Sequence, residues 1–140
     1  MTLLIGTFWW QPDAGSKFAA AYTVYDVLRL QRAVAKHCTV EHKFVVFTDQ
    51  PEQFRSVSNI VTAIPLDRST HVPGTCYARL MTFHPDGPAI FGGERFLQID
   101  LDTLIVGNID HLAQRLENIV LWRNPGRVPW EGGLGAKGQG

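Results

Sequence analysis

Apolar residues occur along this chain in short runs that alternate with amphipathic segments. Runs dominated by apolar residues predict buried strands at Leu3–Phe8 and at Lys43–Thr48, the second with no polar break over residues 44–47. Between them, apolar side chains recur at helical spacing, which predicts a helix from about Phe18 to about His37. Further strand candidates span residues 59–66, 95–99, 104–106 and 119–122, and short helices are expected at about 75–84 and 111–116.

Strands that alternate with helices, and that are apolar on both faces, indicate an α/β fold with a mostly parallel sheet flanked by helices. We expect one domain over residues 1–124. Residues 125–140 hold six glycines and two prolines without periodic apolar positions, and this composition predicts a loop or a disordered tail.

The composition is that of an ordinary globular protein, with 45% hydrophobic and 19% charged residues. Thirteen basic residues balance thirteen acidic ones without a Lys/Arg run, which disfavours a nucleic-acid partner. The apolar N-terminus is too short for a membrane span and lacks the features of a signal peptide, and Cys38 and Cys76 fit no metal-ligand spacing. The expected location is therefore the cytoplasm, with both thiols reduced.

Two carboxylates interrupt an apolar run at Asp100 and Asp102. In extended backbone both would point to one side and Leu101 to the other. Close carboxylates repel, so we expect a hard divalent cation, Mn²⁺ or Mg²⁺, to bridge them at the carboxyl end of their strand. The alternative is that the two aspartates only end the strand and bind water or a backbone amide.

The stretch from Arg95 to Asp110 resembles the Asp-x-Asp segment of GT-A-type glycosyltransferases related to glycogenin and to bacterial lipopolysaccharide galactosyltransferases. In these families an apolar strand enters Asp-x-Asp, and a second apolar run leads to a Gly-(Asn/Asp)-(Leu/Ile) turn. Upstream, the Tyr77-Ala78-Arg79-Leu80 segment is similar to the helix that precedes this strand. The likeness covers about residues 2–124 and implies a Rossmann-like, nucleotide-sugar-binding domain.

By this resemblance, Asp100, Leu101 and Asp102 form the donor-binding segment, with the two aspartates as metal ligands. Arg79 would approach the diphosphate or the donor sugar, although it could instead be a solvated helix charge. Thr7 and Asp49, at the ends of early strands, are candidates for base or ribose contacts, or else a strand-end hydroxyl and a turn-forming residue.

Trp9 and Trp10 follow the first strand. They are expected either to pack at the sheet edge or to form a wall of the nucleotide pocket and stack on the base.

The function implied is transfer of a sugar from a nucleotide-diphosphate donor, a UDP-sugar above all, to a saccharide, a lipid-linked glycan or a protein. Members of the family continue well past this length, so the chain corresponds to the nucleotide-binding half, and a longer chain, an oligomer or a completing partner would supply the rest. One alternative is a non-catalytic nucleotide-sugar-binding remnant. Another is a phosphatase of the haloacid dehalogenase class, whose Asp-x-Asp motif normally lies on the first strand.

Overall fold

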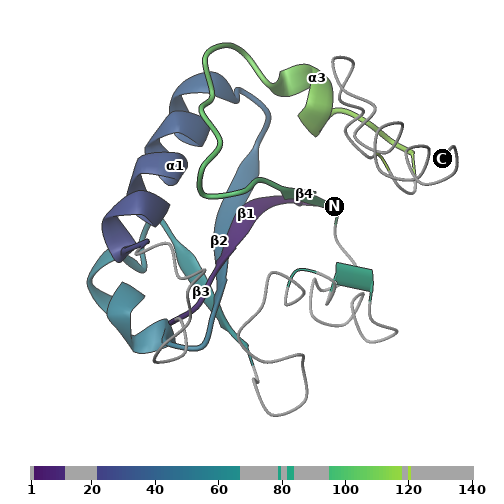
Figure 1. Cartoon of the computed structure of the whole chain (residues 1–140). Coiled ribbons are helices and arrows are strands. Elements are labelled where there is room, and N and C mark those ends of the chain that lie inside the picture. Colours follow the sequence, from purple (N-terminus) through teal and green to yellow (C-terminus); the bar gives the residue numbers. More distant parts are fainter. Residues whose placement is uncertain are drawn as a thin grey trace, which may run out of the picture.

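The computed structural model describes residues 2–11, 22–66, 79, 82–83, 95–117 and 120. Its elements, in chain order, are β1 (Leu3–Trp9), α1 (Val24–His37), β2 (His42–Thr48), the 3-10 helix η1 (Pro51–Val57), β3 (Thr62–Pro65), β4 (Phe96–Gln98) and α3 (Asp110–Ala113). Strands and helices alternate, as Figure 1 shows, and the predicted α/β class is confirmed.

The four strands form one sheet in the order β3-β2-β1-β4, and every pair is parallel. β1 lies between β2 and β4, with Gly6 opposite Val45 on one side and Gln98 on the other. A methyl group at Gly6 would lie 2.2 Å from the Val45 carbonyl oxygen, so the close approach of β1 and β2 requires glycine there. The arrangement is a Rossmann-like α/β sheet.

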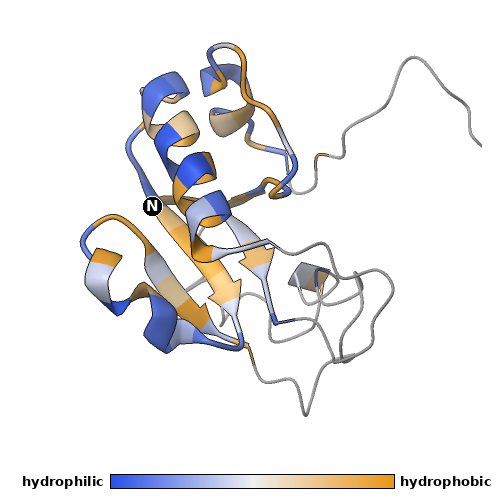
Figure 2. Cartoon of the chain, turned by 60° about the vertical axis from the view of Figure 1, so that its left-hand side comes forward, coloured by the Kyte–Doolittle hydropathy of each residue, from blue (hydrophilic) through white to orange (hydrophobic). Residues whose placement is uncertain are grey.

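Alternate residues of β1 enter different apolar clusters, which explains why nearly all of its residues are apolar. Leu3 and Ile5 belong to the larger cluster, and Leu4 and Phe8 to the smaller one. The larger cluster also contains buried residues of α1 and of the segment after β4: Val27, Leu30, Val34, Leu101, Ile109 and Ala113. Hydrophobic residues dominate the strands, whereas α1 carries both polar and apolar residues (Figure 2).

The helix α1 begins at Val24, later than the predicted start near Phe18. Thr23 has extended backbone, and the Asp26 carboxylate accepts hydrogen bonds from its backbone N–H at 2.8 Å and from its hydroxyl at 3.0 Å. This capping interaction ends the helix on the N-terminal side, because residues that cap a helix adopt non-helical angles. Residues 18–21 lie outside the described part of the chain.

Other predicted boundaries also shift. The strand expected over 59–66 covers only Thr62–Pro65, because residues 58–60 form a turn after η1, a 3-10 helix that the sequence pattern did not predict. Residues 104–106 are not a strand: Leu104 and Val106 are exposed while Ile105 packs on the larger cluster. The helix expected over 111–116 spans Asp110–Ala113.

Most residues of the helix predicted over 75–84, all of the tail 125–140, and most of the strand predicted over 119–122 lie outside the described residues. Within the described part, no helix has the length and apolar character needed to cross a bilayer.

Candidate functional site

The order of the strands defines a switch point between β1 and β4. From β1 the chain adds β2 and then β3 on one side, and β4 on the other side. In open parallel sheets, ligands bind outside the carboxyl ends of the strands where the winding direction reverses. Asp100 lies at this place, since β4 ends at Gln98 and the N–H of Ile99 donates to the Gly6 carbonyl oxygen at 2.9 Å.

The acidic pair lies on a tight turn that follows β4. The N–H of Thr103 donates to the Asp100 carbonyl oxygen at 3.0 Å, and residues 101 and 102 form the turn. The expectation of extended backbone at the pair is therefore wrong. Leu101 is buried in the larger apolar cluster, whereas Asp102 is exposed and Asp100 is partly exposed. Burial of Leu101 anchors the turn and leaves both flanking carboxylates at the surface.

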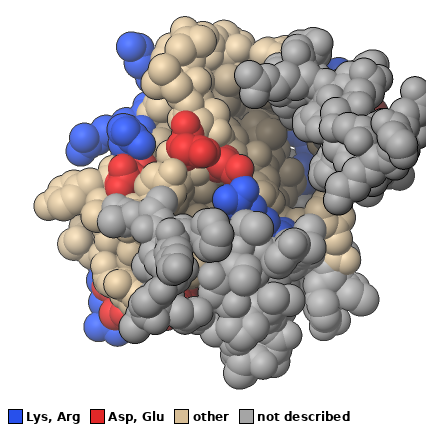
Figure 3. Space-filling model, in the orientation of Figure 1, with Lys and Arg blue, Asp and Glu red and all other residues tan. Residues whose placement is uncertain are grey.

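Arg79 and Asp100 form an ion pair across 21 positions of sequence. The guanidinium Nη1 donates to Asp100 Oδ2 at 2.6 Å, and both side chains are 40% exposed. The Arg79 carbonyl oxygen accepts a hydrogen bond from the Thr82 hydroxyl at 2.8 Å, which holds the backbone at this position. The structure thus brings together two of the residues that the sequence singled out. On the face shown in Figure 3, acidic side chains lie beside a basic one near the centre.

The two candidates on the early strands are placed differently. Thr7 is only 1% exposed, on the side of β1 that carries Ile5 and Trp9, so its hydroxyl is not at the surface. Asp49 directly follows β2 and is half-buried, and its Oδ1 accepts a hydrogen bond from the Gln11 N–H at 3.1 Å. β2 and β4 flank β1, so the carboxyl ends of these two strands are about 10 Å apart. Base or ribose contacts by Thr7 and Asp49 stay predictions.

Trp9 packs in the core. It is 5% exposed, its ring lies edge-on to Phe54 with centroids 5.7 Å apart, and its indole N–H donates to the Tyr22 carbonyl oxygen at 3.0 Å. Trp10 is half-buried and packs against the smaller apolar cluster. The contacts of Trp9 favour packing over stacking on a base.

A second anchor, which the sequence reasoning missed, holds the segment that leads away from the acidic turn. The Asp110 carboxylate accepts hydrogen bonds from the Thr39 N–H at 2.7 Å and the Thr39 hydroxyl at 2.5 Å. Asn108 donates to the same carboxylate at 2.9 Å, and the Ile109 N–H donates to the His37 carbonyl oxygen at 2.9 Å. The only sequence signal for this anchor was the Asn-Ile-Asp turn itself.

These hydrogen bonds hold the pKa of Asp110 well below its ordinary value, first through Asn108 and then through Thr39. Hydrogen bonds to the charged form of a carboxyl favour that form. The segment from the acidic turn to α3 is therefore tied to the C-terminal end of α1 by an ionised side chain. Figure 1 shows this segment running beside α1.

The described residues contain no group of three or more His, Cys, Asp or Glu side chains placed to hold one metal ion. A cation at the acidic turn would therefore take at most two carboxylates from this part of the chain. Its other ligands would come from the bound molecule, from water or from elsewhere.

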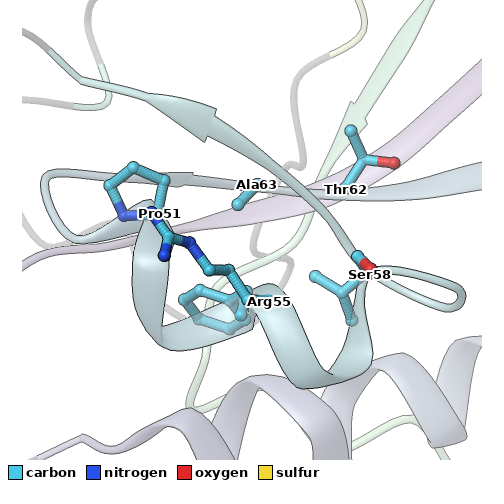
Figure 4. Close-up of a pocket in the computed structure, with 7 residues that line it drawn as sticks. Pro51, Arg55, Ser58, Thr62 and Ala63 are labelled. Carbon is cyan, nitrogen blue, oxygen red and sulfur yellow. The ribbon is translucent and has the colours of Figure 1, made fainter.

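A shallow depression of about 270 Å³ lies away from this turn, between η1 and the edge strand β3 (Figure 4). Its lining is mostly apolar, with Arg55, Ser58 and Thr62 as its polar members. β3 and β4 are at opposite edges of the sheet, so this depression is separate from the acidic turn.

No family model, curated protein or solved structure matches the chain. Functional argument therefore depends on the residues and their geometry.

Proposed function

We propose that this chain is the donor-binding half of a GT-A-type glycosyltransferase, which binds a nucleotide-diphosphate sugar through a divalent cation. The observation that carries the proposal is the Arg79–Asp100 pair beside the exposed Asp102, at the switch point of a parallel sheet. The Arg79 guanidinium would provide donors for phosphate oxygens, and the carboxylates of Asp100 and Asp102 would provide ligands for the cation that accompanies them.

The residues present fit such a cation. Asp100 and Asp102 offer carboxylate oxygens, the ligands that Mg²⁺ and Mn²⁺ prefer, and two protein ligands leave positions for diphosphate oxygens and water. When bound, the ion would supply Lewis-acid stabilisation of the departing nucleoside diphosphate. The chain's own part is to keep the two carboxylates at the surface, which the buried side chain of Leu101 does, and to offer Arg79 as a second positive charge.

The acceptor, whether a saccharide, a lipid-linked glycan or a protein, would be bound by further chain or by a partner. A cytoplasmic location belongs to the same proposal. The remnant alternative, a domain that binds the donor without transferring its sugar, predicts the same binding and no transfer. The phosphatase alternative is weaker, because the acidic motif follows β4 whereas β1 ends in Thr7-Phe8-Trp9 without a carboxylate.

The test is calorimetric titration of UDP and of UDP-sugars into the protein, with and without Mn²⁺. We expect Mn²⁺ to tighten binding of the nucleotide. Asp102→Ala should weaken the metal-dependent binding by at least about 10-fold, because even the loss of a residue that only hydrogen-bonds to a metal ligand has an effect of that size. Glu52→Ala, which removes an exposed carboxylate from η1, is the matched control and should leave binding unchanged. Binding that ignores both Mn²⁺ and the Asp102 substitution would refute the proposal.

A further inference from the structure

A metal ion bound by Asp100 would compete with Arg79 for the same carboxylate. Arg79 Nη1 lies 2.6 Å from Asp100 Oδ2, and a cation bound by Asp100 would need an oxygen of the same carboxylate as its ligand. We propose that Arg79 is an exchangeable partner: it neutralises Asp100 in the free protein and moves to the diphosphate when metal and nucleotide bind. The inference rests on the proposed function and adds to it a specific coupling between the two ligands.

The exchange requires a pair that is easily broken. Both side chains are 40% exposed, so solvent screens their attraction. A pair of this kind changes a binding constant by no more than about five-fold. A divalent ion arriving alone must nevertheless displace the guanidinium or lie beside it, and like charges repel. The free protein should therefore bind the metal alone weakly.

A diphosphate removes this conflict, because it offers the guanidinium another anion. The planar fork of arginine matches phosphate oxygens, and such charge-assisted hydrogen bonds are stronger than neutral ones. The backbone of Arg79 is held by the Thr82 hydroxyl at 2.8 Å, while its long side chain retains rotatable bonds. The head group can therefore change partners without movement of the chain that carries it.

This arrangement predicts effects of opposite sign for one substitution. Arg79→Gln removes the competitor of the metal, so it should tighten binding of Mn²⁺ alone by about two- to five-fold, the range set by an exposed ion pair. The same change removes a donor to the diphosphate, so UDP binding at saturating Mn²⁺ should weaken by about 10-fold or more. A residue that merely supports the local structure would weaken both.

The experiment measures free Mn²⁺ by electron paramagnetic resonance with and without UDP, and UDP binding by calorimetry. Arg32→Gln, the same change on the exposed side of α1, is the control and should shift neither constant. Arg79→Lys keeps the charge but loses the fork, so it should keep the weak binding of Mn²⁺ alone and lose part of the UDP affinity. It serves as the second variant if the Gln variant folds poorly by circular dichroism.

The two proposals fail in different ways. If the wild-type protein binds no Mn²⁺ even with UDP present, the proposed function fails. If it binds both ligands, but Arg79→Gln leaves the affinity for Mn²⁺ alone unchanged or lowers it, the exchange is refuted while the proposed function stands.

Discussion

The contact between β1 and β2 at Gly6 gives the most direct test of the sheet. In Gly6→Ala the new methyl carbon would lie 2.2 Å from the Val45 carbonyl oxygen and 2.5 Å from Val45 Cγ2. Side-chain carbons essentially never come within 3.0 Å of such atoms, so the two strands must separate by about 0.8 Å, the difference between 3.0 and 2.2. Gly6 also pairs with Gln98 of β4, so β1 cannot shift freely in the other direction.

The cost has two parts. Overpacking of a close-packed interior costs about 1–3 kcal/mol. A strand separation of this size also breaks a ladder hydrogen bond, with a net loss of about 1 kcal/mol. The free energy of unfolding should therefore fall by about 2–4 kcal/mol, which lowers the melting temperature by about 10 °C in a chain of this length.

Gly107→Ala is the matched control, because a methyl group there meets no atom within 4 Å and its backbone is outside the left-handed region. That change should leave stability within about 1 kcal/mol of the wild type, or raise it slightly through the entropy of the unfolded chain. Thermal and urea unfolding followed by circular dichroism measure both variants. Equal melting temperatures for the two variants would contradict the assigned register between Gly6 and Val45.

Two further predictions concern the anchors of the fold. The lowered pKa of Asp110 means that its ionised form stabilises the folded protein at pH values above 3.8, its pKa in the unfolded chain. This contribution disappears as the pH falls toward the folded-state pKa. Asp110→Asn should therefore lower stability at pH 7 and reduce the loss of stability below pH 3.8. Urea unfolding at pH 7 and at lower pH values checks this, and an unchanged pH profile would contradict it. Phe54 is 1% exposed and lies edge-on to Trp9, so Phe54→Ala should lower the free energy of unfolding by about 3–5 kcal/mol. Phe83→Ala, at a side chain that is 61% exposed, should cost far less in the same urea titration, and equal losses would argue against the packing of Phe54.

The sequence predicted the fold correctly where burial of apolar side chains alone determines the structure. β1 and β2 are buried on both faces, so their apolar runs were readable without knowledge of the partner strands. The start of α1 could not be predicted in this way, because capping by Asp26 stops the helix inside an apolar, helix-compatible stretch. The strand β3 is a four-residue edge strand, and the extended pattern expected around it overestimated its length.

The candidate site was predicted in part. Asp100 and Asp102 were identified because carboxylates inside an apolar run are conspicuous, and burial of Leu101 between them follows from the same pattern. Their tight turn was not foreseen, since short apolar runs suggest extended backbone on both sides. Contacts such as Arg79–Asp100 and Thr39–Asp110 join residues far apart in the chain, and only the fold can show which charges meet.

The pairing of β4 with the centre of the sheet has a consequence for how the protein forms. Leu4 pairs with Lys43 of β2 across 39 positions that include α1, whereas it pairs with Phe96 of β4 across more than ninety positions. Closing a longer loop costs more entropy, so we expect β4 to dock after β1 and β2 have paired. β4 then pairs over only three residues. Among the described strands, the acidic turn follows the one that closes the longest loop, so a molecule that binds this turn would stabilise the docking of β4 on β1.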